Sequence, residues 1–228
     1  MARRYSSEDA KKRILSVCVK MFIEKGYKDS KMADIMSEAD VTSSTFHNIF
    51  PTKDSVLLCL TEFMFDNQFG AASEFLKEKI DPVMLYALET SIQLTIAELN
   101  ENIREIYVEA YTFPESAEYI YQRTSSKLFG LFSEYLPGKT ESDFYEFEIG
   151  SGGIMRGYMA RPCDKYFTLK RKLERFLTVS LCVYNIPQKR REEVINEILN
   201  TDIVSVANGV MQKLFSALEM RFDFTLAI

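Results

Sequence analysis

The chain has 228 residues, and 46% of them are hydrophobic, which is typical of a globular protein with a sizeable core. The N-terminus lacks the apolar run of a signal peptide, and the longest mostly apolar stretch, "FLTVSLCVYNI", is shorter than the roughly 20 residues of a membrane-spanning helix. We therefore expect a cytoplasmic protein without a membrane partner. The net charge is −5, but residues 1–53 carry +3 and the remainder −8, so the N-terminal part permits a polyanionic partner.

The hydrophobic pattern predicts helices throughout, because apolar residues recur at spacings of three and four without sustained two-residue alternation. The first predicted helix begins after Ser6 or Ser7 as its N-cap and ends at Gly26. A second, short helix is predicted over about 31–38, with Ser30 as its N-cap.

A third short helix is predicted over about 43–49, with Thr42 as its N-cap. Pro51 ends this helix, and Thr52 caps a long fourth helix that extends to about residue 79. Further helices are predicted at 81–99, where Asp81 is the N-cap, and at 101–112, 114–136, 141–160, 167–185 and 188–222. The sequence thus predicts an all-α protein.

The second and third helices have the pattern of a helix-turn-helix motif. The apolar positions that would fill the angle between them are Ile35, Ala39, Val41, Phe46 and Ile49. The tight turn falls at Asp40, where glycine is usual, but aspartate is among the few side chains that tolerate a left-handed backbone.

The outward face of the third helix carries short polar side chains. They are Ser43, Ser44, His47 and Asn48, with Thr45 at the edge. Such side chains can approach phosphates and base edges closely, and asparagine can pair with adenine through two hydrogen bonds. The alternative is a solvated surface helix, which would more often carry Glu, Lys and Gln. We favour a DNA-reading face.

The stretch "GYKDSKMADIMSEADVTSSTFHNIFPTKDSVLLCL" resembles the N-terminal domain of TetR-family (TetR/AcrR) transcriptional regulators. The matching positions are Gly26, Tyr27, Ile35, Ala39, Val41, Thr45, Phe46, Phe50, Lys53 and Leu57. The sequence departs from the family pattern at Met36, Asp40, Ser44 and the pair His47-Asn48. Because Ser44 and His47-Asn48 lie on the reading face, they alter the expected operator sequence and not the expected fold.

The resemblance implies a three-helix DNA-binding domain over residues 1–53, joined by the long fourth helix to a helical dimerisation and ligand-binding domain over 54–228. It implies DNA contacts by Lys31, Ser43, Ser44, Thr45, His47, Asn48 and Lys53, the last to a phosphate. It also implies a homodimer on palindromic double-stranded DNA, with repression relieved by a small-molecule inducer. The other function considered is a TetR-like interaction module that acts mainly through a protein partner, with DNA binding secondary.

The stretch "IGSGGIMRGYM" supports a dimer, because it places Gly150, Gly153 and Gly157 on one helical face. A bare face lets helices approach closely, so we expect the helices near 141–160 and 167–185 to form a four-helix interface across a two-fold axis. The alternative is a kink between helices.

The C-terminal part is rich in aromatic residues and methionine. The candidate ligand-binding residues are Met64, Gln68, Tyr86, Tyr107, Tyr111 and Phe129. They would suit a small apolar or aromatic ligand, with a cationic one also compatible, although such stripes are more often core than ligand site. The sequence contains no nucleophile-base pattern and no cluster of metal ligands, so we expect neither an enzyme nor a cofactor.

Overall fold

The computed structural model of the chain describes residues 7–75 and 81–217, and the side chains of 7–65 and 81–216. Its elements are α1 (Ser7–Lys25), α2 (Met32–Glu38), α3 (Ser43–Ile49), α4 (Lys53–Phe75), α5 (Pro82–Leu99), α6 (Glu101–Ala110), α7 (Pro114–Phe132), η1 (Ser133–Tyr135), α8 (Glu141–Ala160), α9 (Leu169–Val183), α10 (Gln188–Asn200) and α11 (Ile203–Ala217). Within these ranges there is no strand, and the all-α prediction is confirmed. No helix in the described part of the chain is both long and apolar enough to cross a bilayer.

Three of the predicted N-caps are present. The Thr42 hydroxyl accepts from the Thr45 amide at 3.1 Å, and the Thr52 hydroxyl accepts from the Ser55 amide at 3.1 Å. The Asp81 carboxylate accepts from the Met84 amide at 2.7 Å. Each bond satisfies an amide that has no partner within its own helix, which fixes where these helices begin.

The prediction of Ser30 as a cap is wrong. The residue before α2 is Lys31, whose side chain makes no capping bond. The buried Ser30 hydroxyl instead donates to the Gly26 carbonyl at 2.7 Å, because the left-handed Gly26 (φ 89°) ends α1 and turns its carbonyl toward that hydroxyl.

The single helix predicted over 188–222 is two helices. Thr201 has an extended backbone, and the Asp202 carboxylate accepts from the amide of Ser205 at 3.2 Å and from its hydroxyl at 2.7 Å. Aspartate competes with the backbone for nearby amides, so it ends one helix and starts the next.

The helix predicted over 114–136 ends at Phe132 and continues as a short 3-10 turn. Residues 76–79 of the predicted fourth helix, and residues 218–222, lie outside the described residues.

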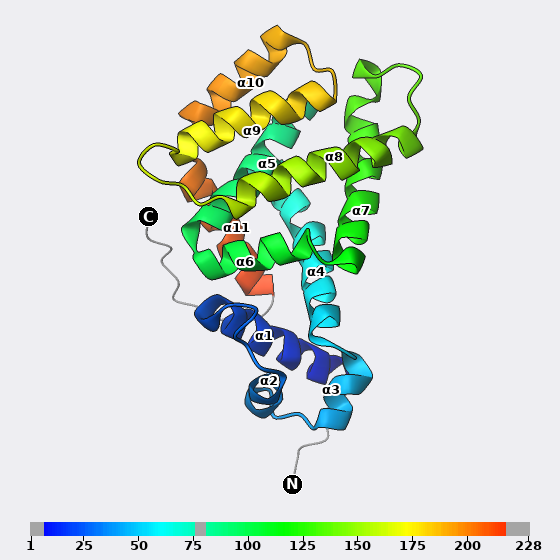
Figure 1. Cartoon of the computed structure of the whole chain (residues 1–228), viewed down its shortest axis with the longest axis vertical. Coiled ribbons are helices and arrows are strands. Elements are labelled where there is room, and N and C mark those ends of the chain that lie inside the picture. The colour runs from blue at the N-terminus through cyan, green and yellow to red at the C-terminus, as the bar shows by residue number, and fades with distance from the viewer. Residues whose placement is uncertain (1–6, 76–80, 218–228) are drawn as a thin grey trace.

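The helices form a small N-terminal unit (α1–α3) and a larger body (α5–α11), with α4 running from one into the other (Figure 1). α5 is the centre of the body and packs against α4 and every body helix. Its sequence is mostly apolar without a solvent-facing polar side, and nearly all of its side chains are buried, as expected of a helix enclosed by others.

The N-terminal unit also rests on α6. The Asn102 side-chain amide donates to the Ile23 carbonyl at 2.8 Å, and Lys28 pairs with Glu109 at 2.7 Å. Gly26 lies close to the Glu105 carboxylate, which a Cβ atom would approach to 2.9 Å, and its left-handed backbone (φ 89°) favours glycine. The N-terminal unit is therefore held by both α4 and α6.

Candidate nucleic-acid interface

The turn between α2 and α3 is closed by two backbone bonds around a left-handed Asp40 (φ 53°). The Asp40 amide donates to Ser37 at 3.2 Å, and the Val41 amide donates to Met36 at 3.1 Å. These bonds are those of a Schellman motif, in which the left-handed residue reverses the chain just after the helix. From α1, the Arg13 guanidinium donates to the Ala39 carbonyl at 3.0 Å and holds this turn in place.

The inner face of the motif is built as predicted. Ile35, Ala39 and Phe46 are buried against α1 and the start of α4, while Val41 and Ile49 are half-buried at the edge. α3 is only seven residues long and contains poor helix formers, so this packing and the Thr42 cap hold it helical.

The opposite face of α3 is open. Ser43, Ser44, His47 and Asn48 are exposed, and Thr45 is half-buried with its hydroxyl 2.9 Å from that of Thr42. The structure therefore brings five of the seven predicted DNA-contacting residues onto one short helix.

His47 has a defined orientation within that face. Its Nδ1 lies 3.2 Å from the Pro51 carbonyl, and its ring meets the Phe46 ring edge-on. In the tautomer with the proton on Nδ1, this bond leaves Nε2 as an acceptor for a donor outside the protein.

The two lysines that were predicted to contact DNA differ in their surroundings. Lys31 is exposed at the start of α2, whereas the Lys53 ammonium donates to the Tyr27 and Lys28 carbonyls and lies 4.3 Å from the centre of the Tyr27 ring. Burial lowers the pKa of Lys53. The Tyr27 hydroxyl donates to Asp54 at 2.6 Å, so Lys53 and Asp54 together fasten the start of α4 to the end of α1. The structure thus gives Lys53 a bracing position that the sequence pattern did not indicate.

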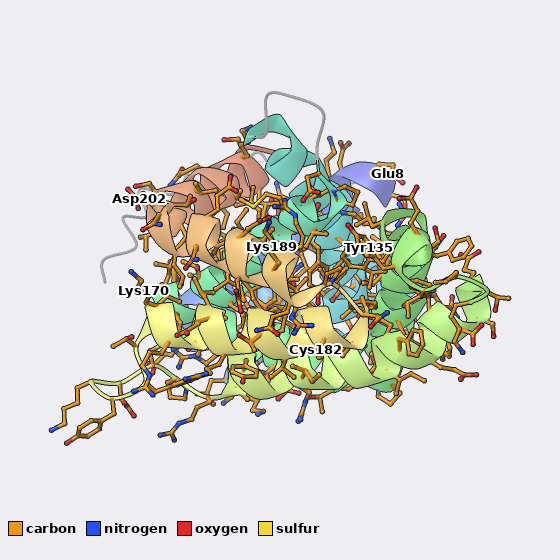
Figure 2. The ribbon with its side chains drawn as sticks, turned by 90° about the horizontal axis from the view of Figure 1, so that it is seen from above. Glu8, Tyr135, Lys170, Cys182, Lys189 and Asp202 are labelled. Carbon is orange, nitrogen blue, oxygen red and sulfur yellow. The ribbon has the colours of Figure 1, made fainter. Side chains whose placement is uncertain are left out.

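The predicted dimer helices form one outer face of the body. α8 and α9 lie together on the front of the molecule in Figure 1 and along one edge in Figure 2, where Lys170 and Cys182 mark α9. Added Cβ atoms at Gly150, Gly153 and Gly157 would meet nothing within 4 Å. On the same two helices, Ile149 is 48% and Val179 43% exposed, so α8 and α9 carry bare backbone and exposed apolar side chains.

The candidate ligand-binding residues do not share one cavity. Met64 and Tyr107 line an apolar cavity between α1, α4, α6 and α11, whereas Tyr86 and Tyr111 line a polar cavity between α5, α7, α8 and α9. Phe129 lines neither of these two, and its ring packs edge-on against Phe144 at 5.5 Å. The Gln68 side chain lies outside the described residues. Spacing along a helix predicted burial but not which cavity each side chain faces.

No group of three or more His, Cys, Asp or Glu side chains within the described ranges is placed to hold a metal ion. The four cysteines are free thiols, and Cys18 is the buried one.

Residues 14–60 match the family described as "Bacterial regulatory proteins, tetR family". The chain is 28% identical over 98 residues to the uncharacterized HTH-type transcriptional regulator YuxN of Bacillus subtilis (strain 168), a stretch that covers 43% of this chain but only 32% of that relative. Among solved structures, the gamma-butyrolactone receptor (ArpA like protein) aligns over 91% of this chain and 98% of its own, with 14% identity and a TM-score of 0.44.

Proposed function

We propose that this chain, which belongs to the TetR family of bacterial regulatory proteins, reads DNA sequence with the exposed face of α3 and acts as a homodimeric repressor. In this proposal residues 1–53 are the DNA-binding domain, and 54–228 supply the dimer contact and a ligand site. The observation that carries it is the gathering of Ser43, Ser44, His47 and Asn48 on one exposed face of a helix whose other face packs into the core of the N-terminal unit.

The chemistry of that face suits the major groove. Ser43 and Ser44 are short enough for the helix to approach the phosphate backbone closely, and both can donate to phosphate oxygens. Asn48 offers a donor and an acceptor for adenine, and His47 offers one acceptor in the tautomer described above. Lys31, exposed at the start of α2, would add a phosphate contact.

The α8–α9 face supports a two-fold dimer. Glycines without neighbours let the backbone of α8 approach a second copy, and Ile149 and Val179 would lose water on contact. A closed two-fold dimer presents two α3 helices to DNA, which requires a palindromic operator with half-sites about one helical turn apart.

The test is selection of binding sites from a random DNA library, followed by affinity measurements against salt on the selected site. We expect a palindrome and a steep loss of affinity with salt. The substitution His47→Ala should reduce affinity for the selected site more than for random DNA, since a base contact would be lost.

The matched pair Lys31→Ala and Lys25→Ala removes the same charge at two positions. It therefore distinguishes a direct phosphate contact from a general effect of net charge on DNA affinity. Both lysines are exposed, but Lys25 lies in the last turn of α1, next to the contact with α6. We expect only Lys31→Ala to reduce DNA affinity. Failure of the library to enrich any site would sink the proposal and favour the module that acts through a protein partner.

A further inference from the structure

The polar cavity in the body has no part in reading DNA, yet it contains buried groups that lack partners. It lies between α5, α7, α8 and α9, with Tyr111 at the end of α6, and has an empty volume of about 440 Å³ that includes space open to solvent. Because that volume counts open solvent, the enclosed part is much smaller, and only a compact ligand would fit.

Two hydrogen-bond acceptors on its wall are buried and incompletely used. The Glu148 side chain is 4% exposed, and its Oε2 accepts from the Ser151 hydroxyl at 2.5 Å and from the Tyr184 hydroxyl at 3.2 Å. No basic side chain among the described residues pairs with it. Gln93 is also 4% exposed, and its amide oxygen has no hydrogen-bond partner. A buried acceptor without a donor destabilises the protein, so Gln93 favours a ligand that donates. A buried carboxylate without a counter-ion favours a ligand that is positively charged.

The one lysine on the wall is already paired. The Lys127 ammonium lies 2.6 and 2.7 Å from the two carboxylate oxygens of Glu89, so this pair is neutral as a whole. Burial raises the pKa of Glu148 to about 7, because the hydrogen bonds from Ser151 and Tyr184 offset only part of the cost of removing the carboxylate from water. An anionic ligand would find no spare cation here, and a neutral ligand would leave the Glu148 carboxylate uncompensated.

Four aromatic side chains also line the cavity, beside aliphatic residues and threonines. Phe65, Tyr86, Tyr111 and Phe176 contribute rings to the same cavity. Aromatic faces attract organic cations through their quadrupole, and a carboxylate among aromatic rings is the usual arrangement for recognising an amine.

We propose that this cavity binds a small protonated organic amine, whose ammonium group donates to Glu148 and Gln93 while its carbon part packs against the aromatic rings. The inference deepens the proposed function, because it names the chemical class of the ligand that the regulator would sense.

The test uses the full chain and calorimetric titration with butylamine, 2-phenylethylamine and tryptamine, and with 2-phenylethanol and phenylacetate as neutral and anionic counterparts. We expect 2-phenylethylamine or another amine of the series to bind at least about tenfold more tightly than 2-phenylethanol, because a charge-assisted hydrogen bond is lost in the alcohol. Phenylacetate should not bind.

Two variants locate the site. Glu148→Gln keeps an oxygen for Ser151 and Tyr184 but removes the charge, so it should abolish the preference for amine over alcohol. Gln93→Met removes an amide oxygen that has no partner, so the fold should tolerate it while amine affinity falls. Glu134→Gln, at an exposed position in η1, is the control and should change nothing.

A second readout is proton release. Because the pKa of Glu148 is about 7, a bound ammonium should displace roughly half a proton at pH 7, which appears as a dependence of the binding heat on the ionisation heat of the buffer. Glu148→Gln should remove that dependence even where it retains some affinity.

Three outcomes would each overturn the proposal. They are equal binding of amine and alcohol, an amine preference that survives Glu148→Gln, and no binding by any amine at millimolar concentration. DNA binding to the selected site, measured without amine in the same preparation, keeps the two proposals apart. If DNA binds and amines do not, the cavity assignment fails alone. If amines bind and no DNA site is selected, the regulator proposal fails alone.

Discussion

Removing the charge of Glu148 should stabilise the protein, and the gain should grow with pH. Burial raises the pKa of this carboxyl group from an ordinary value of 4.5 to about 7. The folded state therefore holds a proton between these two values that the unfolded state has already released. Stability then falls as pH rises through this window, and the loss is complete above pH 7. At roughly 1.4 kcal/mol per pKa unit, the displacement amounts to about 3 kcal/mol.

The assay is urea denaturation of the chain and of Glu148→Gln at fixed protein concentration, at pH 4.5, 6 and 8. The difference in free energy of unfolding between the two proteins should be near zero at pH 4.5 and reach about 3 kcal/mol in favour of the variant at pH 8. Burial also raises the pKa of Glu89, against the opposing charge of Lys127, but that contribution is common to both proteins and cancels in the difference. A difference that does not change with pH would show that Glu148 is not desolvated as the structure implies.

Three further predictions concern packing and helix capping. A Cβ atom at Gly152 would lie 2.8 Å from the Tyr121 ring, so Gly152→Ala should destabilise the α7–α8 contact by about 1–3 kcal/mol in urea denaturation. A Cβ atom at the next residue, Gly153, would meet nothing within 4 Å, so Gly153→Ala should leave the subunit at least as stable. It should weaken self-association in sedimentation measurements. Similar behaviour of both variants would contradict the proposed dimer face. Thr42→Ala should lower stability by about 1 kcal/mol in thermal melts through loss of the α3 cap, whereas Thr42→Ser should restore it.

Local signals predicted the N-terminal unit well. The Thr42 and Thr52 caps and the left-handed Asp40 depend on contacts between residues one to five positions apart, which a sequence displays directly. Ser30 was misassigned because a hydroxyl can satisfy either the following amides or the preceding carbonyl, and the chosen partner depends on how Gly26 turns the chain.

The wall of the polar cavity could not be predicted in the same way. Glu89 and Lys127 are 38 positions apart in the sequence, and Tyr184 is 36 positions from Glu148. A helical pattern shows that such side chains lie on an apolar face but not which distant partner they meet there. Buried Glu and Gln on strongly apolar helices were the available signal: "ALETSIQLTIAEL" places Glu89 and Gln93 one turn apart on the most buried helix.

The two proposals meet in α6, which lies between the polar cavity and the N-terminal unit. Tyr111 follows its last residue and lines the polar cavity, while Asn102 in its first turn bonds the Ile23 carbonyl at the end of α1. Between them, Glu105 and Glu109 face Gly26 and Lys28. A ligand can change DNA affinity only if it favours one arrangement of these contacts over another. Because α6 is short and packed at both ends, a displacement of Tyr111 cannot be absorbed within the helix. The contacts at Ile23, Gly26 and Lys28 are therefore one route, beside α4, by which such a change would reach the N-terminal unit.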